Sequence, residues 1–246
     1  MKGIVFFLSV LIIGQIPPDF KSDQMKYSRV RTAFSEKLDT IKANLESHDI
    51  QLNKLNIYLR VFKSEEQLEV WGKNKSDTAF QLLKVYDICA SSGKLGPKRQ
   101  EGDLQVPEGF YHISVFNPAS TFYLSLGVNY PNKSDRILGV QGSLGGDIYI
   151  HGSCCTIGCV PITDDKIKEL YVYAVEARNN GQYRIPVTFF PMRLTLANML
   201  KLSQDYADKT EYLNLWKDLE KAFRHFEKTK KLPEITVLSD GRHRVK

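Results

Sequence analysis

Residues 147–162 constrain the fold most, because a short strand-like run leads there into a turn rich in glycine and cysteine. The run at 148–150 delivers His151 into that turn, and the chain then returns to Cys159. A histidine and a cysteine therefore lie within one tight loop. A thiolate can attack a carbonyl carbon while a nearby imidazole manages the proton. We interpret His151 as a base and Cys159 as a nucleophile.

Small residues around the cysteine suit that chemistry. Gly158 lets the backbone turn without a side chain, and Thr156 could cap the turn. The amides of Gly158 and Cys159 could then point at an oxyanion, where one donor contributes about 3 kcal/mol. Pairing with an imidazolium would lower the pKa of the thiol from its usual value of about 8.5.

Two other interpretations of this loop remain open. The first is zinc, for which the loop holds four potential ligands, His151, Cys154, Cys155 and Cys159. Structural zinc sites normally use two separated cysteine pairs, and adjacent cysteines do not easily occupy two corners of one tetrahedron. The second is a buried histidine beside small buried cysteines, which the density of glycine, cysteine and threonine disfavours. We predict no metal site and no cofactor.

The rest of the chain alternates between strand-like and helical patterns. Alternating apolar residues predict six strands, at 55–62, 67–71, 79–88, 110–116, 121–128 and 183–190. Helical spacing predicts three longer helices, at 25–48, 163–181 and 195–227, the second with Thr163 as its N-cap. The glycines and prolines of 91–109 match no phosphate-binding motif. This pattern is typical of a mainly β (α+β) domain with helices added at both ends.

The N-terminus has the pattern of a secretory signal. Lys2 precedes an apolar run at 4–13, and Pro17 and Pro18 follow it. The run is too short to span a bilayer comfortably, since about 20 apolar residues are needed. We expect residues 1–18 to be a signal peptide or an uncleaved N-terminal anchor. The chain would then be exported to the periplasm or cell envelope.

The net charge limits the classes of partner that the chain can bind, and the positions of the cysteines limit how many disulfides it can form. The net charge of +6 permits anionic partners, but no basic run interleaved with aromatics predicts nucleic-acid binding. Cys154 and Cys155 are adjacent, and a bridge between neighbours is strained. We expect at most one disulfide and at least one free thiol. Either one of these two cysteines is buried and inert or Cys154 helps to position the loop, and a Cys154–Cys159 bridge could form an inactive oxidised state.

The loop resembles a known signature. His151-Gly152, followed by Thr156-x-Gly158-Cys159, is similar to the HG and S/T-x-G-C motifs of the YkuD-type L,D-transpeptidases. The resemblance is closer to the YafK-like branch, where the motif halves lie close together and a second cysteine follows the HG pair. Further blocks resemble that branch at 92–98, 102–103, 107–111, 126–132 with Asp135, and 185–191. Together they extend the resemblance over most of 55–240.

This resemblance implies both a fold and a reaction. It implies that Cys159 is the nucleophile, that His151 is the general base, and that Gly152 and Gly158 shape the site. The implied catalytic domain is a YkuD-like β-sandwich over 54–192, between a helical segment at 19–53 and a helical extension at 193–246 packed on it. Members attack the carboxyl side of the L-centre of a diaminopimelate-type residue in peptidoglycan stem peptides. An amine or water then resolves the acyl-enzyme.

One position departs from the family pattern. Many members carry arginine two residues after the cysteine, whereas this chain has Val160-Pro161. Carboxylate recognition must then come from elsewhere. Four candidates lie near the motif blocks, with solvated surface as the alternative for each cation: Lys98, Lys133, Arg136 and Tyr130.

The functional expectation is an exported cysteine enzyme that transfers stem peptides during cell-wall biogenesis. The alternative is a hydrolase that releases wall-bound lipoprotein or trims cross-links, followed by a wall-binding module without turnover. Expected partners are peptidoglycan stem peptides and a wall-anchored lipoprotein, without nucleic acid. Membrane contact would occur only through an uncleaved leader.

Overall fold

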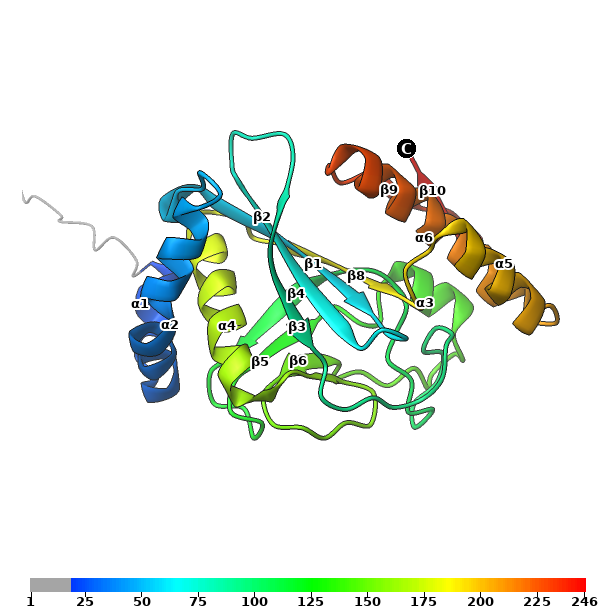
Figure 1. Cartoon of the computed structure of the whole chain (residues 1–246). Helices are drawn as coiled ribbons and strands as arrows, with labels where there is room; N and C mark the ends of the chain where they lie inside the picture. The colour runs from blue at the N-terminus through cyan, green and yellow to red at the C-terminus, as the bar shows by residue number, and fades with distance from the viewer. Residues whose placement is uncertain (1–18) are drawn as a thin grey trace, which may run out of the picture.

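The computed structural model describes residues 19–246, so the predicted leader at 1–18 lies outside the described residues. Within them, the centre is a curled sheet of eight strands in the order β3-β2-β1-β8-β4-β5-β6-β7 (Figure 1). Its strands are β1 (Leu55–Phe62), β2 (Gln67–Asn74), β3 (Gln81–Asp87), β4 (Gly109–Asn117), β5 (Ser125–Val128), β6 (Tyr149–His151), β7 (Val160–Pro161) and β8 (Ile185–Phe190). A separate hairpin pairs β9 (Ile235–Val237) with β10 (His243–Val245).

Six α-helices accompany the sheet within the described residues, two before its first strand, two between its strands and two after its last strand. They are α1 (Phe20–Gln24), α2 (Ser28–Glu46), α3 (Lys133–Leu138), α4 (Thr163–Asn179), α5 (Leu196–Asp205) and α6 (Thr210–Thr229), with a 3-10 turn at Leu52–Lys54. No helix within 19–246 is both long and apolar enough to cross a membrane.

The sheet is mixed. Strand β1 runs antiparallel to β2 but parallel to β8, and β4 runs antiparallel to both β8 and β5. At the far edge β6 runs antiparallel to β5 and parallel to β7. The predicted catalytic loop therefore forms one edge of the sheet.

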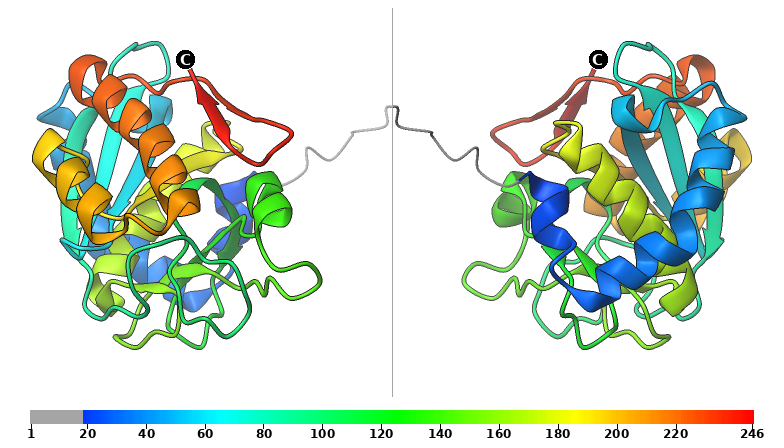
Figure 2. Two further views of the ribbon diagram at one scale, coloured as in Figure 1. Left: turned by 90° about the vertical axis from the view of Figure 1, so that its right-hand side faces the viewer. Right: turned by 90° about the vertical axis from the view of Figure 1, so that its left-hand side faces the viewer.

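Helices α1, α2 and α4 cover one face of the sheet (Figure 2). Helix α4 lies against the sheet and α2 packs on α4. Apolar residues of α2 recur at helical spacing and are buried, among them Phe34 and Ile41. They share a core with Leu170 of α4 and with Leu59 and Val187 of the central strands.

Helices α5 and α6 lie beyond the opposite face (Figure 1). Neighbouring side chains along a strand point to opposite faces, so Phe62 and Phe190 face α6 while Phe189 enters the first core. The rings of Phe62 and Phe190 stack at 5.3 Å, and both contact Phe223 of α6. Trp216 of α6 completes this second core.

The α+β arrangement, with helices at both ends, agrees with the predicted class. Three elements have no counterpart in the prediction: α3, β7 and the hairpin β9–β10. The single helix expected at 195–227 is divided into α5 and α6. The strand expected at 121–128 is confined to β5. Thr163 is not an N-cap, because the cap is Ile162 and Thr163 already opens α4 with a φ of 70°.

Candidate active site

The parallel pairing of β6 and β7 brings the two predicted catalytic residues to the same edge of the sheet. Ile150 pairs with Val160, and both are buried in the first core. Because side chains alternate along strands, His151 projects from the face opposite to Ile150. Cys159 directly precedes β7, and its Sγ contacts the backbone that leads into β6, at Asp147.

His151 is held as a neutral base. Its side chain is buried, and its Nδ1 lies 2.5 Å from the carbonyl oxygen of Gly152. A carbonyl only accepts hydrogen bonds, so Nδ1 carries the hydrogen and Nε2 keeps a free lone pair in the neutral ring. The ring of Phe122 stacks on the imidazole at 4.5 Å. Burial lowers the pKa of His151 below its usual value, although the hydrogen bond to Gly152 opposes the shift.

Cys159 is held as a neutral thiol. It is partly buried, and its Sγ donates to the carbonyl oxygen of Asp147 at 3.4 Å. Burial raises the pKa of this thiol, and nearby Asp147 raises it further, while the backbone of Tyr149 and the charge of Lys98 lower it. A resting thiolate–imidazolium pair is therefore not supported. The thiol must lose its proton to a base as it attacks.

The turn before the nucleophile is stabilised by one hydroxyl. Thr156 Oγ1 accepts from the Gly158 amide at 3.0 Å and donates to the Cys159 carbonyl at 2.8 Å. Thr156 thus caps the turn. Gly158 has a φ of +136°, a conformation that favours glycine. Its amide is already used, so only the Cys159 amide is left of the predicted oxyanion pair.

Gly152 allows α4 to hold the loop from below. A Cβ atom there would lie 2.5 Å from Asp164 Oδ1 and 2.7 Å from the carbonyl oxygen of Phe122. The same Asp164 oxygen accepts from the Ser153 amide at 2.7 Å. The missing side chain therefore lets the first turn of α4 bind the loop next to His151.

A disulfide fixes the loop from the other side. Cys154 is bonded to Cys89, which lies just after β3, with 5.6 Å between their Cα atoms. Cys155 and Cys159 are free, so the prediction of at most one disulfide and at least one free thiol is confirmed. Of the two alternatives for the adjacent cysteines, burial is excluded because Cys154 and Cys155 are both exposed, whereas Cys154 does help to position the loop through its disulfide. A bridge between Cys154 and Cys159 is not formed.

The disulfide also argues against the zinc interpretation, because it removes Cys154 from the proposed set of ligands. Among residues 19–246, no group of three or more His, Cys, Asp or Glu side chains is arranged to hold a metal ion.

A pocket of about 390 Å³ lies next to the strand that carries His151, although neither His151 nor Cys159 lines it. Asp147 and Tyr149 line it, and both also act on Cys159. Three of the predicted substrate-binding residues line it as well: Tyr130, Lys133 and Arg136. Lys133 and Arg136 are exposed on α3, and neither forms an ion pair within residues 19–246.

Lys98 lies outside the lining of this pocket. Its ammonium group is buried and pairs with Asp103 at 2.6 Å, with Gln100 accepting a second hydrogen bond. It also lies over the ring of Tyr130 at 5.9 Å. Lys98 therefore supports the pocket wall and lowers the pKa of Cys159, but its charge is already paired and is not free to bind a carboxylate.

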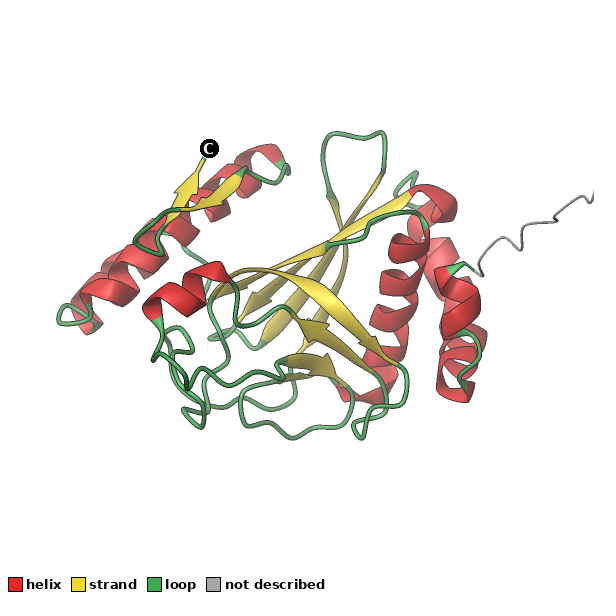
Figure 3. Cartoon of the chain, turned by 180° about the vertical axis from the view of Figure 1, so that it is seen from behind, coloured by secondary structure: helices red, strands yellow, loops and turns green. Residues whose placement is uncertain are grey.

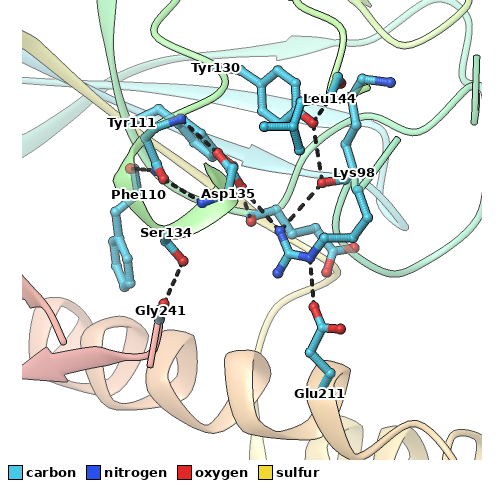
Figure 4. Close-up of polar contacts among 12 residues, drawn as sticks. Lys98, Phe110, Tyr111, Tyr130, Ser134, Asp135, Leu144, Glu211 and Gly241 are labelled. Carbon is cyan, nitrogen blue, oxygen red and sulfur yellow. Dashed lines mark hydrogen bonds and ion pairs between the residues drawn. The ribbon is translucent and has the colours of Figure 1, made fainter. Parts of the chain in front are cut away.

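Helix α3, which carries the two free cations, is fixed by the contacts that Figure 4 shows. The buried Asp135 accepts from the Tyr111 hydroxyl at 3.0 Å and from Arg99 at 3.1 Å. Arg99 also contacts Glu211 of α6 at 2.6 Å. The pocket wall is thereby tied to both the sheet and the C-terminal helices.

The family model for the YkuD L,D-transpeptidase catalytic domain matches residues 56–189. The chain belongs to this family. A relative from Escherichia coli K12, named "Putative L,D-transpeptidase YafK", is 34% identical over 195 residues, which cover 78% of this chain and 75% of the relative. The predicted family and its α+β fold are therefore confirmed.

Two solved structures are more distant. The helical cell shape determining protein Pgp2 from Campylobacter jejuni is 18% identical with a TM-score of 0.45, covering 74% of this chain and 73% of that one. Bd1075 from Bdellovibrio bacteriovorus is 20% identical with a TM-score of 0.41, covering 74% and 76%.

Some residues around the L,D-transpeptidase motif were not predicted. Tyr149 carried a usable signal, since it lies two positions before His151 on a strand and must share its face. Phe122 carried none, because it reaches the imidazole from the loop before β5. Asp147 acts on Cys159 through its charge and also through its carbonyl oxygen, and no side-chain pattern predicts the carbonyl contact.

Proposed function

We propose that this chain is an exported L,D-transpeptidase that acts on peptidoglycan stem peptides through an acyl-enzyme on Cys159. Family membership supports the reaction class. The observation that carries the assignment is that the paired strands β6 and β7 place a neutral His151 and a neutral Cys159 at the same edge of the sheet. Export rests on the leader pattern at 1–18.

The first half-reaction transfers the acyl group to sulfur. Cys159 Sγ attacks the peptide carbonyl carbon, a carbon–sulfur bond forms, and the thiol proton moves to Nε2 of His151. The carbonyl oxygen becomes an oxyanion, which the Cys159 amide is placed to stabilise. When the intermediate collapses, the carbon–nitrogen bond breaks and His151 returns the proton to the leaving amine. A thioester remains on Cys159.

The second half-reaction reverses these steps with a new nucleophile. An amine or a water molecule gives its proton to His151 and attacks the thioester, and the sulfur leaves as the thiol. Transfer and hydrolysis share this route and differ only in which nucleophile arrives. Hydrolysis is therefore the second outcome of the same site.

Substrate carboxylates would be recognised across the pocket. Pro161 occupies the position at which many members carry arginine, and it pairs with His151 in the sheet. Lys133 and Arg136 face the same pocket from α3 and supply positive charge near Cys159. They replace the missing arginine in this proposal.

The test is mass spectrometry of purified muropeptides after incubation with the enzyme, with and without an added amine. We expect Cys159→Ala to abolish product formation, because no other group replaces the sulfur. Cys155→Ala is the matched control, since Cys155 is a free, exposed cysteine in the same loop and should remain active.

Each outcome separates two functions. New amide products with the added amine indicate transfer, whereas shortened peptides alone indicate hydrolysis. Full activity of Cys159→Ala would contradict the nucleophile assignment. Peptide binding by the wild-type protein without turnover, and without labelling by a carbapenem, would instead favour the wall-binding module.

A further inference from the structure

Helix α6 carries a row of cations on its solvent side. Its large apolar side chains, among them Trp216, Leu219 and Phe223, are buried in the second core. Hairpin β9–β10 runs along one flank of α6 (Figure 3), where Asp218 accepts from the His243 amide at 3.1 Å. On the side opposite to the core, four exposed cations recur at steps of three or four residues and form what we call the basic row: Lys217, Lys221, Arg224 and Lys228.

The basic row has charge to spare. Lys221 contacts Asp218 at 3.1 Å and Arg224 contacts Glu220 at 3.4 Å, both within α6. Lys217 and Lys228 form no ion pair within residues 19–246. Residues 193–246 hold twelve Lys or Arg against eight Asp or Glu, so the C-terminal extension carries most of the chain's net charge of +6. Such an excess of positive charge attracts anionic surfaces.

Exposed leucines of α5 lie beside the basic row. Leu196 is 72% exposed, and Leu200, one turn further along α5, is 56% exposed. Leu196 lines an open hollow of about 690 Å³ together with Arg224 and Lys228, so a leucine and two cations of the row border the same surface. Helices α5 and α6 face the viewer in the left view of Figure 2. Neighbouring exposed apolar side chains with a polar rim mark an interaction surface.

The residue types on this surface favour a lipid bilayer over a protein or a soluble polymer. Lysine is depleted from protein–protein interfaces, where aromatic residues and arginine are enriched, whereas three of the four cations in the basic row are lysines. A soluble polyanion would pair with the cations but would leave the leucines uncovered. A bilayer with anionic lipids offers phosphate groups to the lysines and acyl chains to the leucines.

We propose that the α5–α6 face binds the surface of a bilayer that contains anionic phospholipids. The basic row contacts the headgroups, and Leu196 and Leu200 insert between them. This contact adds to the expectation from the sequence, which allowed membrane contact only through an uncleaved leader. It goes beyond the proposed function, because the family model ends at residue 189, before the C-terminal extension begins.

The proposed contact leaves the catalytic edge open. Neither the cations of the basic row nor the two leucines line the pocket next to β6. Strand β6 also lies apart from α5 and α6 in Figure 1. A chain bound through α5 and α6 would therefore keep its active site accessible to substrate near the membrane.

The direct test compares two double variants by sedimentation with vesicles. Lys217→Gln/Lys228→Gln removes the unpaired cations of the row, whereas Lys54→Gln/Lys75→Gln removes two exposed cations where β1 begins and β2 ends. The vesicles contain either equal parts of phosphatidylglycerol and phosphatidylcholine or phosphatidylcholine alone. A contribution from an uncleaved leader would be common to all variants.

We expect the wild-type chain to prefer the mixed vesicles and to lose this preference as salt is added. Lys217→Gln/Lys228→Gln should bind the mixed vesicles about 25-fold more weakly, because each cation close to an anionic bilayer contributes about fivefold. Lys54→Gln/Lys75→Gln should bind like the wild type. If the double variant of the row does not fold, the two single variants decide the matter, with a loss of about fivefold each.

A leucine variant distinguishes a bilayer from a soluble polyanion. Leu196→Ser/Leu200→Ser keeps the basic row, so it should bind polyphosphate like the wild type. It should bind the mixed vesicles about tenfold more weakly, because it loses apolar area that acyl chains would cover. The control is Tyr183→Ser, a 73% exposed residue between α4 and β8, which should match the wild type for both ligands. Urea unfolding transitions show whether each variant keeps its fold.

The results that would overturn the proposal are distinct. Unchanged vesicle binding by Lys217→Gln/Lys228→Gln, or equal binding of the wild type to both vesicle types, would mean that the face does not bind anionic lipid. If the leucine variant kept its full vesicle binding while polyphosphate binding depended on the row, the partner would be a soluble anionic polymer instead. Acylation of Cys159 by a carbapenem should be unchanged in every variant, so its absence in the wild type would contradict the proposed function and leave this inference standing.

Discussion

The face of the sheet under α4 and the face under α6 are both buried, but by different chemistry. Under α4 the contacts are a continuous apolar core, in which Leu170 and Val172 meet Leu59 and Val187. Two charged residues of α4 are also buried, Glu169 and Glu176, and each is paired with one lysine at the edge of this core. Under α6 four charged side chains are themselves buried beneath the helices: Arg60, Lys63, Glu69 and Glu108.

Each buried charge on the α6 face has a specific partner. Arg60 is fully buried, lies 2.7 Å from Glu227 of α6, and has five aromatic rings within 5.7 Å of its guanidinium carbon. Glu108 accepts from Lys63 at 2.9 Å and from Trp216 of α6 at 2.6 Å. These contacts fix α6 against the sheet.

The difference shows where the fold can carry function. The α4 face is filled at its centre by apolar side chains that need no directional contacts. The α6 face holds its helices by directional contacts, and His151 projects from that face of the sheet. Its stability should therefore depend on single polar groups.

The largest expected effect breaks that polar network. Glu69 is buried, pairs with Arg193 at 2.7 Å and Arg60 at 3.5 Å, and accepts from Trp71 Nε1. Glu69→Ala should lower the free energy of unfolding by about 3–5 kcal/mol, because it leaves the buried Trp71 Nε1 without its acceptor and removes one of the two carboxylates that face the buried Arg60. Urea unfolding at neutral pH measures this loss.

Two further variants sharpen the comparison between the faces. Glu69→Gln keeps an acceptor for Trp71 and should lose less than Glu69→Ala. Leu170→Ala on the α4 face should lose about 2–5 kcal/mol by leaving a cavity. A loss below about 1 kcal/mol for Glu69→Ala would contradict the view that single polar groups hold the α6 face.

Removing the disulfide should lower the free energy of unfolding by a smaller amount. The disulfide joins Cys89 to Cys154 across a sequence separation of 65 residues. Replacing both by serine should cost about 2–4 kcal/mol, because closing a long loop removes entropy from the unfolded chain. Cys155→Ser is the matched control and should unfold like the wild type. Equal stability of the double variant and the control would mean that the bond does not hold the catalytic loop.

Local patterns predicted much of the fold and the core of the site. Alternation located most strands, since the half-buried surface of a strand imposes a period of two residues. The HG and T-x-G-C motifs located His151, which lies on β6, and Cys159, which directly precedes β7 at the sheet edge. These features depend on residues that are close in sequence.

Long-range features could not be predicted in the same way. The partner of Cys154 depends on how the segment after β3 folds back toward the loop, which the spacing of cysteines does not specify. Lysine is usually a surface residue, but Lys98 is buried and its ammonium group is paired with Asp103. The protonation of Cys159 depends on burial that only the packed structure provides.

The smallest expected effect concerns how the α6 face tunes its base. The Phe122 ring stacks on the buried His151, and burial lowers the pKa of that imidazole. His151 must be neutral to accept the thiol proton, so the acid limb of kcat/KM reports its pKa in the free enzyme and should lie below the usual value of about 6.5. Phe122→Ala lets water reach the ring and stabilises the imidazolium.

The pKa of His151 should therefore rise in Phe122→Ala, and the acid limb should move to higher pH. Phe122→Leu keeps apolar cover and should move it less. A kcat/KM profile from pH 4 to 8, with unfolding followed at each pH, separates this shift from lost stability. If the acid limb stayed fixed in both variants while the fold was intact, burial under Phe122 would not set the basicity of His151. The hydrogen bond from Nδ1 to Gly152 would then be the controlling contact.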